Sequence, residues 1–97
     1  MNMQALMKQA QAMQKDIARI KEEIDKTEFE GVSQLVTVKV NGKKEVLSVV
    51  IAKEIDLDDM DMLEAMIVIA FNEAFMKVDK TTEEKMGKYS NMMPGLM

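Results

Sequence analysis

LVTVKVNGKKEVLSVVI, residues 35–51, decides the fold, because it holds two strand patterns on either side of a turn signal. Strands are expected over residues 35–40 and 43–51, where β-branched and other apolar residues dominate. The dipeptide Asn41-Gly42 between them is typical of a two-residue hairpin turn of type I′. The stretch therefore predicts an antiparallel β-hairpin.

The register that this turn sets predicts which residues share a face of the sheet. It pairs Val36 with Leu47 and Val38 with Glu45. One face is then apolar and carries Val36, Val38, Leu47, Val49 and Ile51. The other face is still half apolar, so we expect something to cover part of it.

A long helix is expected before the hairpin. Residues 2–28 carry apolar residues at alternating spacings of three and four, which is typical of a helix that packs against another helix. Asn2 is a candidate N-cap for it. A further strand pattern follows over residues 27–32. The sheet is therefore expected to have three strands in the order of the chain.

A second helix is expected after the sheet, beginning at an N-cap at Asp56 or Asp58 and ending near Met86 with Gly87 as its C-cap. The sequence thus predicts an α+β fold with the order helix, three-stranded antiparallel meander, helix. We expect one domain over residues 1–87 and a loose tail over residues 88–97.

The middle of the second helix, residues 66–71, is apolar on all sides. One sheet covers only one stripe of a helix, so this helix needs cover from a second direction. A chain of 97 residues has little left to supply it, and we expect a homodimer. Asn72 is interpreted as a polar pair across the dimer axis or as a bond to the sheet backbone. The residues assigned to the dimer interface are Ile67, Ile69, Ala70, Phe71, Asn72 and Ala74.

The charge of the chain is unevenly distributed. The net charge is −4, yet Asp16 is the single acid within residues 1–21. Helical spacing places four basic residues on one stripe opposite the apolar positions: Lys8, Lys15, Arg19 and Lys26. Two interpretations stay open for this stripe. It is either an ordinary solvated face whose charge is absorbed by Glu22 and Glu23 one turn away, or a phosphate-binding face.

The composition excludes several classes of function. The chain has no cysteine and no histidine, which excludes thiol nucleophiles, disulfides and the usual zinc sites. No nucleophile–base pair can be assembled, so we expect neither an enzyme nor a bound cofactor or metal. No apolar run approaches the roughly 20 residues that span a bilayer. The acids at positions 56, 58, 59 and 61 lack the glycine and the final glutamate of a calcium loop, and are interpreted as capping residues.

The motifs in their order along the chain resemble the YbaB/EbfC family of small bacterial nucleoid-associated proteins. The segments that carry the resemblance are LMKQAQ (6–11), VKVNGK (38–43), AFNEA (70–74), EKMG (84–87) and Pro94-Gly95. The link over residues 31–35 departs from the family, because it is short and has a single glycine.

The resemblance implies an intertwined homodimer with projecting helical arms. It also implies binding to duplex DNA with little or loose sequence preference, a place in the nucleoid of the cytoplasm, and a role in organising DNA or modulating expression. The expected DNA-binding residues are Lys8, Lys15, Arg19, Lys26, Gln11, Lys43, Lys44 and Lys88. The alternative is an interaction module for replication or recombination proteins, with weak DNA binding. The salt dependence of DNA binding distinguishes the two.

Overall fold

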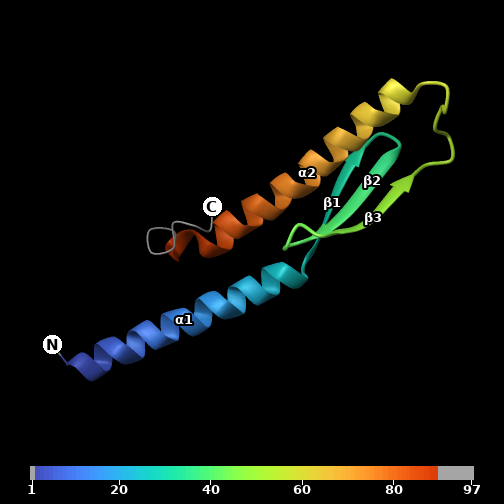
Figure 1. Cartoon of the computed structure of the whole chain (residues 1–97). Coiled ribbons are helices and arrows are strands. Elements are labelled where there is room, and N and C mark those ends of the chain that lie inside the picture. Colours follow the sequence, from blue (N-terminus) through green and yellow to red (C-terminus); the bar gives the residue numbers. More distant parts are fainter. Residues whose placement is uncertain (1, 90–97) are drawn as a thin grey trace.

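The computed structural model describes residues 2–89, which form a helix, three strands, a second helix and a short 3-10 helix (Figure 1). The elements are α1 (Met3–Lys26), β1 (Glu28–Ser33), β2 (Val36–Asn41), β3 (Val46–Ile51), α2 (Met60–Met86) and η1 (Gly87–Tyr89). The strands pair antiparallel in the order β1-β2-β3. The predicted α+β class and the predicted order of elements are confirmed.

Polar side chains cap both long helices at their N-termini. The Asn2 side chain accepts a hydrogen bond of 3.0 Å from the backbone N–H of Gln4, so the predicted cap of α1 is confirmed. The cap of α2 is Asp59, which accepts from the N–H of Met62 at 3.1 Å. The prediction of Asp56 or Asp58 was wrong by one to three residues. Asp56 instead accepts from the N–H of Asp58 at 2.9 Å and shapes the turn before the helix.

The turn between β2 and β3 differs from the predicted type I′ turn. Asn41 pairs with Glu45 through an N–H···O bond of 3.0 Å, which leaves a three-residue loop over 42–44. Within this loop, Lys44 is the residue with positive φ, at 63°, and Gly42 has none. A three-residue loop that ends in a left-handed residue is the second common way to close a hairpin.

The longer loop changes the predicted register. Val36 lies opposite Ile51 instead of Leu47, and Val38 lies opposite Val49. The loop alone would exchange the two faces of β3, but a bulge between Lys39 and Val40 exchanges them back. The predicted pairs were therefore wrong by four residues, although Val49 and Ile51 still share a face with the valines of β2.

Two glycines allow close approaches between backbones. A Cβ atom on Gly42 would lie 1.9 Å from the carbonyl oxygen of Ile24, at the end of α1. A Cβ atom on Gly31 would lie 1.9 Å from the carbonyl oxygen of Ala70, in the middle of α2. Gly42 therefore lets the hairpin tip touch the base of α1, and Gly31 lets β1 touch α2.

The main core lies between α2 and the two strands β1 and β2. Val36, Val38 and Val40 are fully buried there, and Ala70 and Ala74 are fully buried in the same cluster. The two alanines were predicted at the dimer interface. Because they pack against their own sheet, no surface of theirs is left for a partner. A second, smaller core joins α1 to the end of α2 and consists of Ile20, Ile24, Met86 and Tyr89.

Strand β3 and one side of α2 are left uncovered within the chain. All six residues of β3 are exposed. On α2, Ile69 is 54% exposed and Asn72 is also exposed, while Ile67 and Phe71 are half-buried against the main core. A single copy of the chain therefore leaves apolar residues of β3 and α2 in contact with water.

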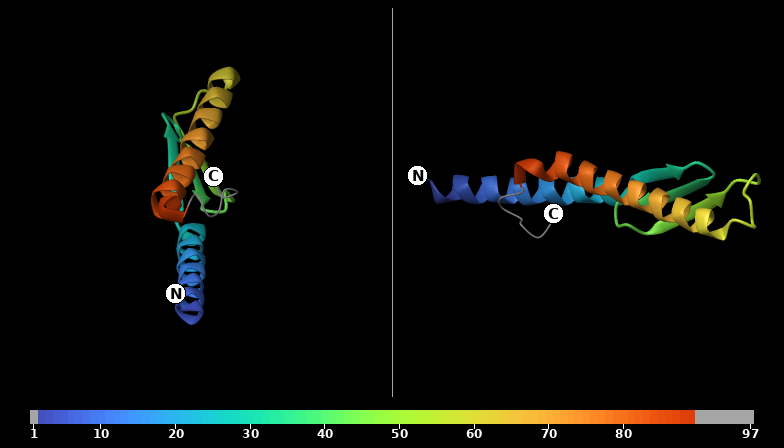
Figure 2. Two further views of the ribbon diagram at one scale, coloured as in Figure 1. Left: turned by 90° about the vertical axis from the view of Figure 1, so that its left-hand side faces the viewer. Right: turned by 90° about the horizontal axis from the view of Figure 1, so that it is seen from above.

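The molecule is elongated, with extents of 70 × 20 × 14 Å and a radius of gyration of 18.9 Å. A compact chain of this length would have a radius of gyration of about 13 Å. The difference comes from α1, which projects beyond the sheet as an arm (Figures 1 and 2). No helix within residues 2–89 is both long and apolar enough to cross a bilayer.

The expected loose tail, residues 88–97, falls largely outside the described residues. Its first two residues, Lys88 and Tyr89, belong to η1, and Tyr89 is buried against α1. The ordered structure therefore continues past Gly87, where we expected the domain to end.

Candidate nucleic-acid interface

The arm is the part of the chain that stands farthest from the sheet. Helix α1 contacts the end of α2 along its C-terminal half, through Ile20 and Ile24. Its first ten residues, from Met3 to Ala12, are exposed throughout. Figure 2 shows this half of α1 running beyond the end of α2. A long ligand can therefore approach the N-terminal half of the arm without meeting the sheet.

Most cations at the base of the arm are paired with acids one turn away. Arg19 binds Asp16 and also Glu23, the latter at 2.9 Å. Lys26 binds Glu22 at 2.9 Å, and this pairing raises the pKa of Lys26 and lowers that of Glu22. The solvated-face interpretation thus describes Arg19 and Lys26 correctly. Each would have to exchange a carboxylate for a phosphate in order to bind DNA.

The outer half of the arm has a different electrostatic character. Residues 2–15 contain Lys8 and Lys15 and no acid. Within residues 2–89, neither lysine makes an ion pair. They lie seven residues apart on one side of the helix, about 10 Å along its axis. Gln11 lies between them and is exposed. These are the predicted residues that the structure leaves ready to meet an anion.

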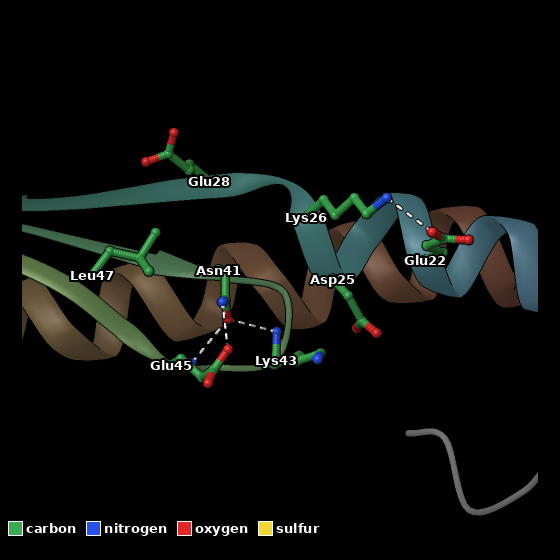
Figure 3. Close-up of a pocket in the computed structure, with 8 residues that line it drawn as sticks. All are labelled: Glu22, Asp25, Lys26, Glu28, Asn41, Lys43, Glu45 and Leu47. Atoms are coloured by element: carbon green, nitrogen blue, oxygen red, sulfur yellow. Dashed lines mark hydrogen bonds and ion pairs between the residues drawn. The ribbon is translucent and has the colours of Figure 1, made fainter.

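The hairpin tip carries Lys43 and Lys44, which were also predicted to contact DNA. Lys44 is bound to Asp79 of α2 at 2.8 Å. Lys43 borders an open pocket at the junction of α1 and the sheet, together with Asp25 and Glu45 (Figure 3). The pocket lining is Glu22, Asp25, Lys26, Glu28, Asn41, Lys43, Glu45 and Leu47, in which acids outnumber lysines. The surroundings of both lysines are therefore less favourable to phosphate than the outer arm.

Asp16 is the point at which three groups from two elements meet. The Tyr89 hydroxyl donates a hydrogen bond of 2.6 Å to Asp16, and the Lys88 ammonium lies 3.2 Å from the same carboxylate oxygen. With Arg19 as a further donor, these contacts hold the pKa of Asp16 well below its usual range. The same carboxylate raises the pKa values of Tyr89 and Lys88. Lys88 is therefore brought to the arm as predicted, but as an internal ion pair.

Asp16 and Tyr89 are the residues that sequence reasoning missed. Asp16 was treated as an isolated acid off the basic stripe, and Tyr89 was placed in the tail. No local pattern links them, because 73 positions separate them in the sequence. The available signal was indirect: the apolar seam of α1 requires a partner, and the end of α2 is the nearest candidate.

The comparisons with known proteins agree with this architecture. The profile of the YbaB/EbfC DNA-binding family matches residues 1–93. A nucleoid-associated protein of Ligilactobacillus salivarius is 44% identical over 99% of this chain and 95% of its own length. One from Enterococcus faecalis is 40% identical over 97% of this chain and 93% of its own length.

A solved structure shows the same fold at lower identity. The crystal structure of an uncharacterized Helicobacter pylori protein superposes with a TM-score of 0.72 at 21% identity, covering 87% of this chain and 91% of that one. The family profile spans nearly the whole chain, and its relatives match it end to end. The chain therefore belongs to the YbaB/EbfC DNA-binding family.

Proposed function

We propose that this protein is a nucleoid-associated, homodimeric DNA-binding protein of the cytoplasm that contacts duplex phosphates with the outer halves of two helical arms. The observation that carries the proposal is the exposed pair Lys8 and Lys15, on a segment without acids that stands clear of an acidic body. Relatives are named nucleoid-associated proteins, and the family is described as DNA-binding and not as a family of enzymes.

The binding is electrostatic and depends little on base sequence. Lysines that neutralise phosphates release condensed counterions, and that release supplies the affinity of non-specific binding. Gln11 can add a hydrogen bond between the two lysines. Arg19, Lys26 and Lys88 contribute less, because each already has a carboxylate partner. The net charge of −4 keeps the affinity of one dimer modest and favours many dimers along one DNA.

The homodimer is supported by the uncovered residues of β3 and α2. In β3, Val49 and Ile51 are 43% and 42% exposed, on the face that carries Val36 and Val38. On α2, Val68 is 58% exposed. An exposed apolar edge strand is a hazard for a soluble chain, and pairing with a second copy removes it. A dimer built on this surface carries two arms.

A second candidate function has its own supporting observation. At the outer end of the arm, Met3, Leu6 and Met7 are 71%, 39% and 58% exposed. This apolar surface is suited to a helix of another protein, such as a replication or recombination factor. In this interaction-module alternative the protein binds DNA only weakly.

The experiment that separates the two is a mobility shift on random-sequence duplex at two salt concentrations, with light scattering of the free protein. Binding through lysines must weaken steeply as salt rises, and the mass must be that of a dimer. Weak DNA binding that hardly responds to salt would favour the interaction module. A monomeric mass would contradict the two-armed arrangement.

A further inference from the structure

The apolar seam of α1 is covered along only half of its length. Its C-terminal half, with Ile17, Ile20 and Ile24, packs against Met86 and Tyr89. Its N-terminal half continues the same stripe but remains exposed at Met3 and Leu6, with Met7 beside them. The uncovered surface is thus a direct continuation of an existing helix–helix interface.

The chain leaves that interface at the boundary between the covered and uncovered halves. Tyr89 is buried beside Ile20, and its hydroxyl is held by Asp16 at 2.6 Å. Lys88 adds an ion pair of 3.2 Å to the same carboxylate. Residue 90 therefore begins next to the point at which the seam becomes exposed.

The remaining residues have the composition and the length to continue the interface. Residues 90–97, SNMMPGLM, contain no charged side chain and include Met92, Met93, Leu96 and Met97. At about 3.3 Å per extended residue, eight residues reach up to about 26 Å. The seam from Asp16 back to Met3 is about 20 Å long, at 1.5 Å per helical residue.

We propose that residues 91–97 lie along the exposed half of the α1 seam and cover Met3, Leu6 and Ala10. A segment tethered at Tyr89 meets this surface at an effective concentration in the millimolar range, which a second copy reaches only at very high protein concentration. Flexible methionine side chains adapt to an irregular helical surface. This differs from the expectation of a loose tail over residues 88–97.

The proposed contact leaves the cationic side of the arm free. Lys8 and Lys15 lie on the side of α1 opposite the seam, so a segment on the seam does not cover them. It removes exposed methionine and leucine from water and holds the outer half of the arm against the rest of the chain. The proposal goes beyond DNA binding and stands whether or not the arm binds DNA.

Disulfide trapping in the full-length chain tests the proposal, because the natural sequence has no cysteine. The test variant carries Leu6→Cys with Leu96→Cys. The matched control carries Ala5→Cys with Leu96→Cys, which moves one cysteine by one residue to a position off the seam. Both are oxidised mildly at low protein concentration, and the products are separated by mass under denaturing conditions.

We expect the test variant to form an intrachain disulfide about tenfold faster than the control. Equal rates would overturn the proposal, because an unattached tail reaches both positions alike. A product of doubled mass would also overturn it, since the seam would then be covered by a second copy. Amide exchange gives a second readout without cysteines: replacing Met92, Met93 and Leu96 by Ser should accelerate exchange in residues 3–13, and unchanged exchange there contradicts the contact.

Discussion

The Tyr89 hydroxyl donates a hydrogen bond of 2.6 Å to the carboxylate of Asp16 and so joins the end of α2 to the middle of α1. A second junction lies near the base of the arm, where Gly42 lets the hairpin tip meet the backbone of Ile24. Two separated contacts define an orientation better than one does. The direction of the arm is therefore built into the fold of a single chain.

The first prediction concerns the hydroxyl of Tyr89. Tyr89→Phe keeps the ring beside Ile20 and Ile24 but removes the donor to Asp16. We expect faster amide exchange over residues 16–24, because local opening of the arm becomes easier, while the strands keep their protection. Tyr89→Ala also removes the ring and should have the larger effect. Unchanged exchange of α1 in Tyr89→Phe would show that the hydrogen bond does not hold the arm.

The second prediction is the pH dependence of this junction. Folding lowers the pKa of Asp16, so its contribution to stability is present above the unfolded value of about 3.9 and is lost as the pH falls below it. Folding raises the pKa values of Tyr89 and Lys88, so their contributions are complete below about pH 10 and are lost at higher pH. The difference in melting temperature between the parent and Asp16→Asn should stay constant from about pH 5 to 9 and shrink below about pH 4. A change centred near neutral pH would point to other groups.

The third prediction uses the contrast between glycines. A Cβ at Gly31 meets the Ala70 carbonyl at 1.9 Å, so Gly31→Ala must push β1 away from α2. We expect a loss of about 2–3 kcal/mol in the free energy of unfolding. A Cβ at Gly87 meets nothing within 4 Å, and its φ of −56° suits alanine. Gly87→Ala should be neutral or stabilise by about 0.4–1 kcal/mol. Equal effects of the two in chemical denaturation would contradict the packing.

Much of the fold was predictable, because local patterns determine it. The seam of α1, the valines of β2 and the apolar run of α2 each predicted the right element, and Asn2 its cap. The hairpin register was not predictable from Asn41-Gly42 alone. That dipeptide suits a type I′ turn, but here the glycine is needed for its contact with Ile24, a residue far away in sequence.

The candidate site was predictable only in part, because charge pairing depends on neighbours. Sequence spacing gave both outcomes for Arg19, and the structure shows it bound to Asp16 and Glu23. Lys8 differs because no acid lies within reach along the helix. The role of Lys88 required the fold, since its partner Asp16 is on the other helix.

The fourth prediction tests the dimer at an exposed position. Ile69 is 54% exposed in the single chain, so Ile69→Asp should change stability by less than about 0.5 kcal/mol if the protein were a monomer. We expect instead a loss of the dimer, because an unpaired carboxylate would be buried against the partner. Met7→Asp, an equally exposed apolar position on the arm, serves as the control and should stay dimeric. Light scattering measures both, and a dimeric Ile69→Asp would place the interface elsewhere.

The fifth prediction concerns the lysines of the arm, and its control is matched in charge. Lys8→Ala with Lys15→Ala removes two exposed cations from the arm, and Lys39→Ala with Lys53→Ala removes two exposed cations from the body. All four substitutions should leave stability within about 0.5 kcal/mol per site. Arg19→Ala should weaken DNA binding less than Lys8→Ala, because Arg19 is already paired with Glu23.

The most direct test of the central claim is the slope of log affinity against log salt concentration on random-sequence duplex, measured for the parent and both double variants. The slope should become shallower by about 0.9 for each phosphate contact that the arm variant loses, whatever the DNA sequence, and should be unchanged in the body variant. An arm variant with the affinity and slope of the parent would contradict the claim that the outer arm binds DNA.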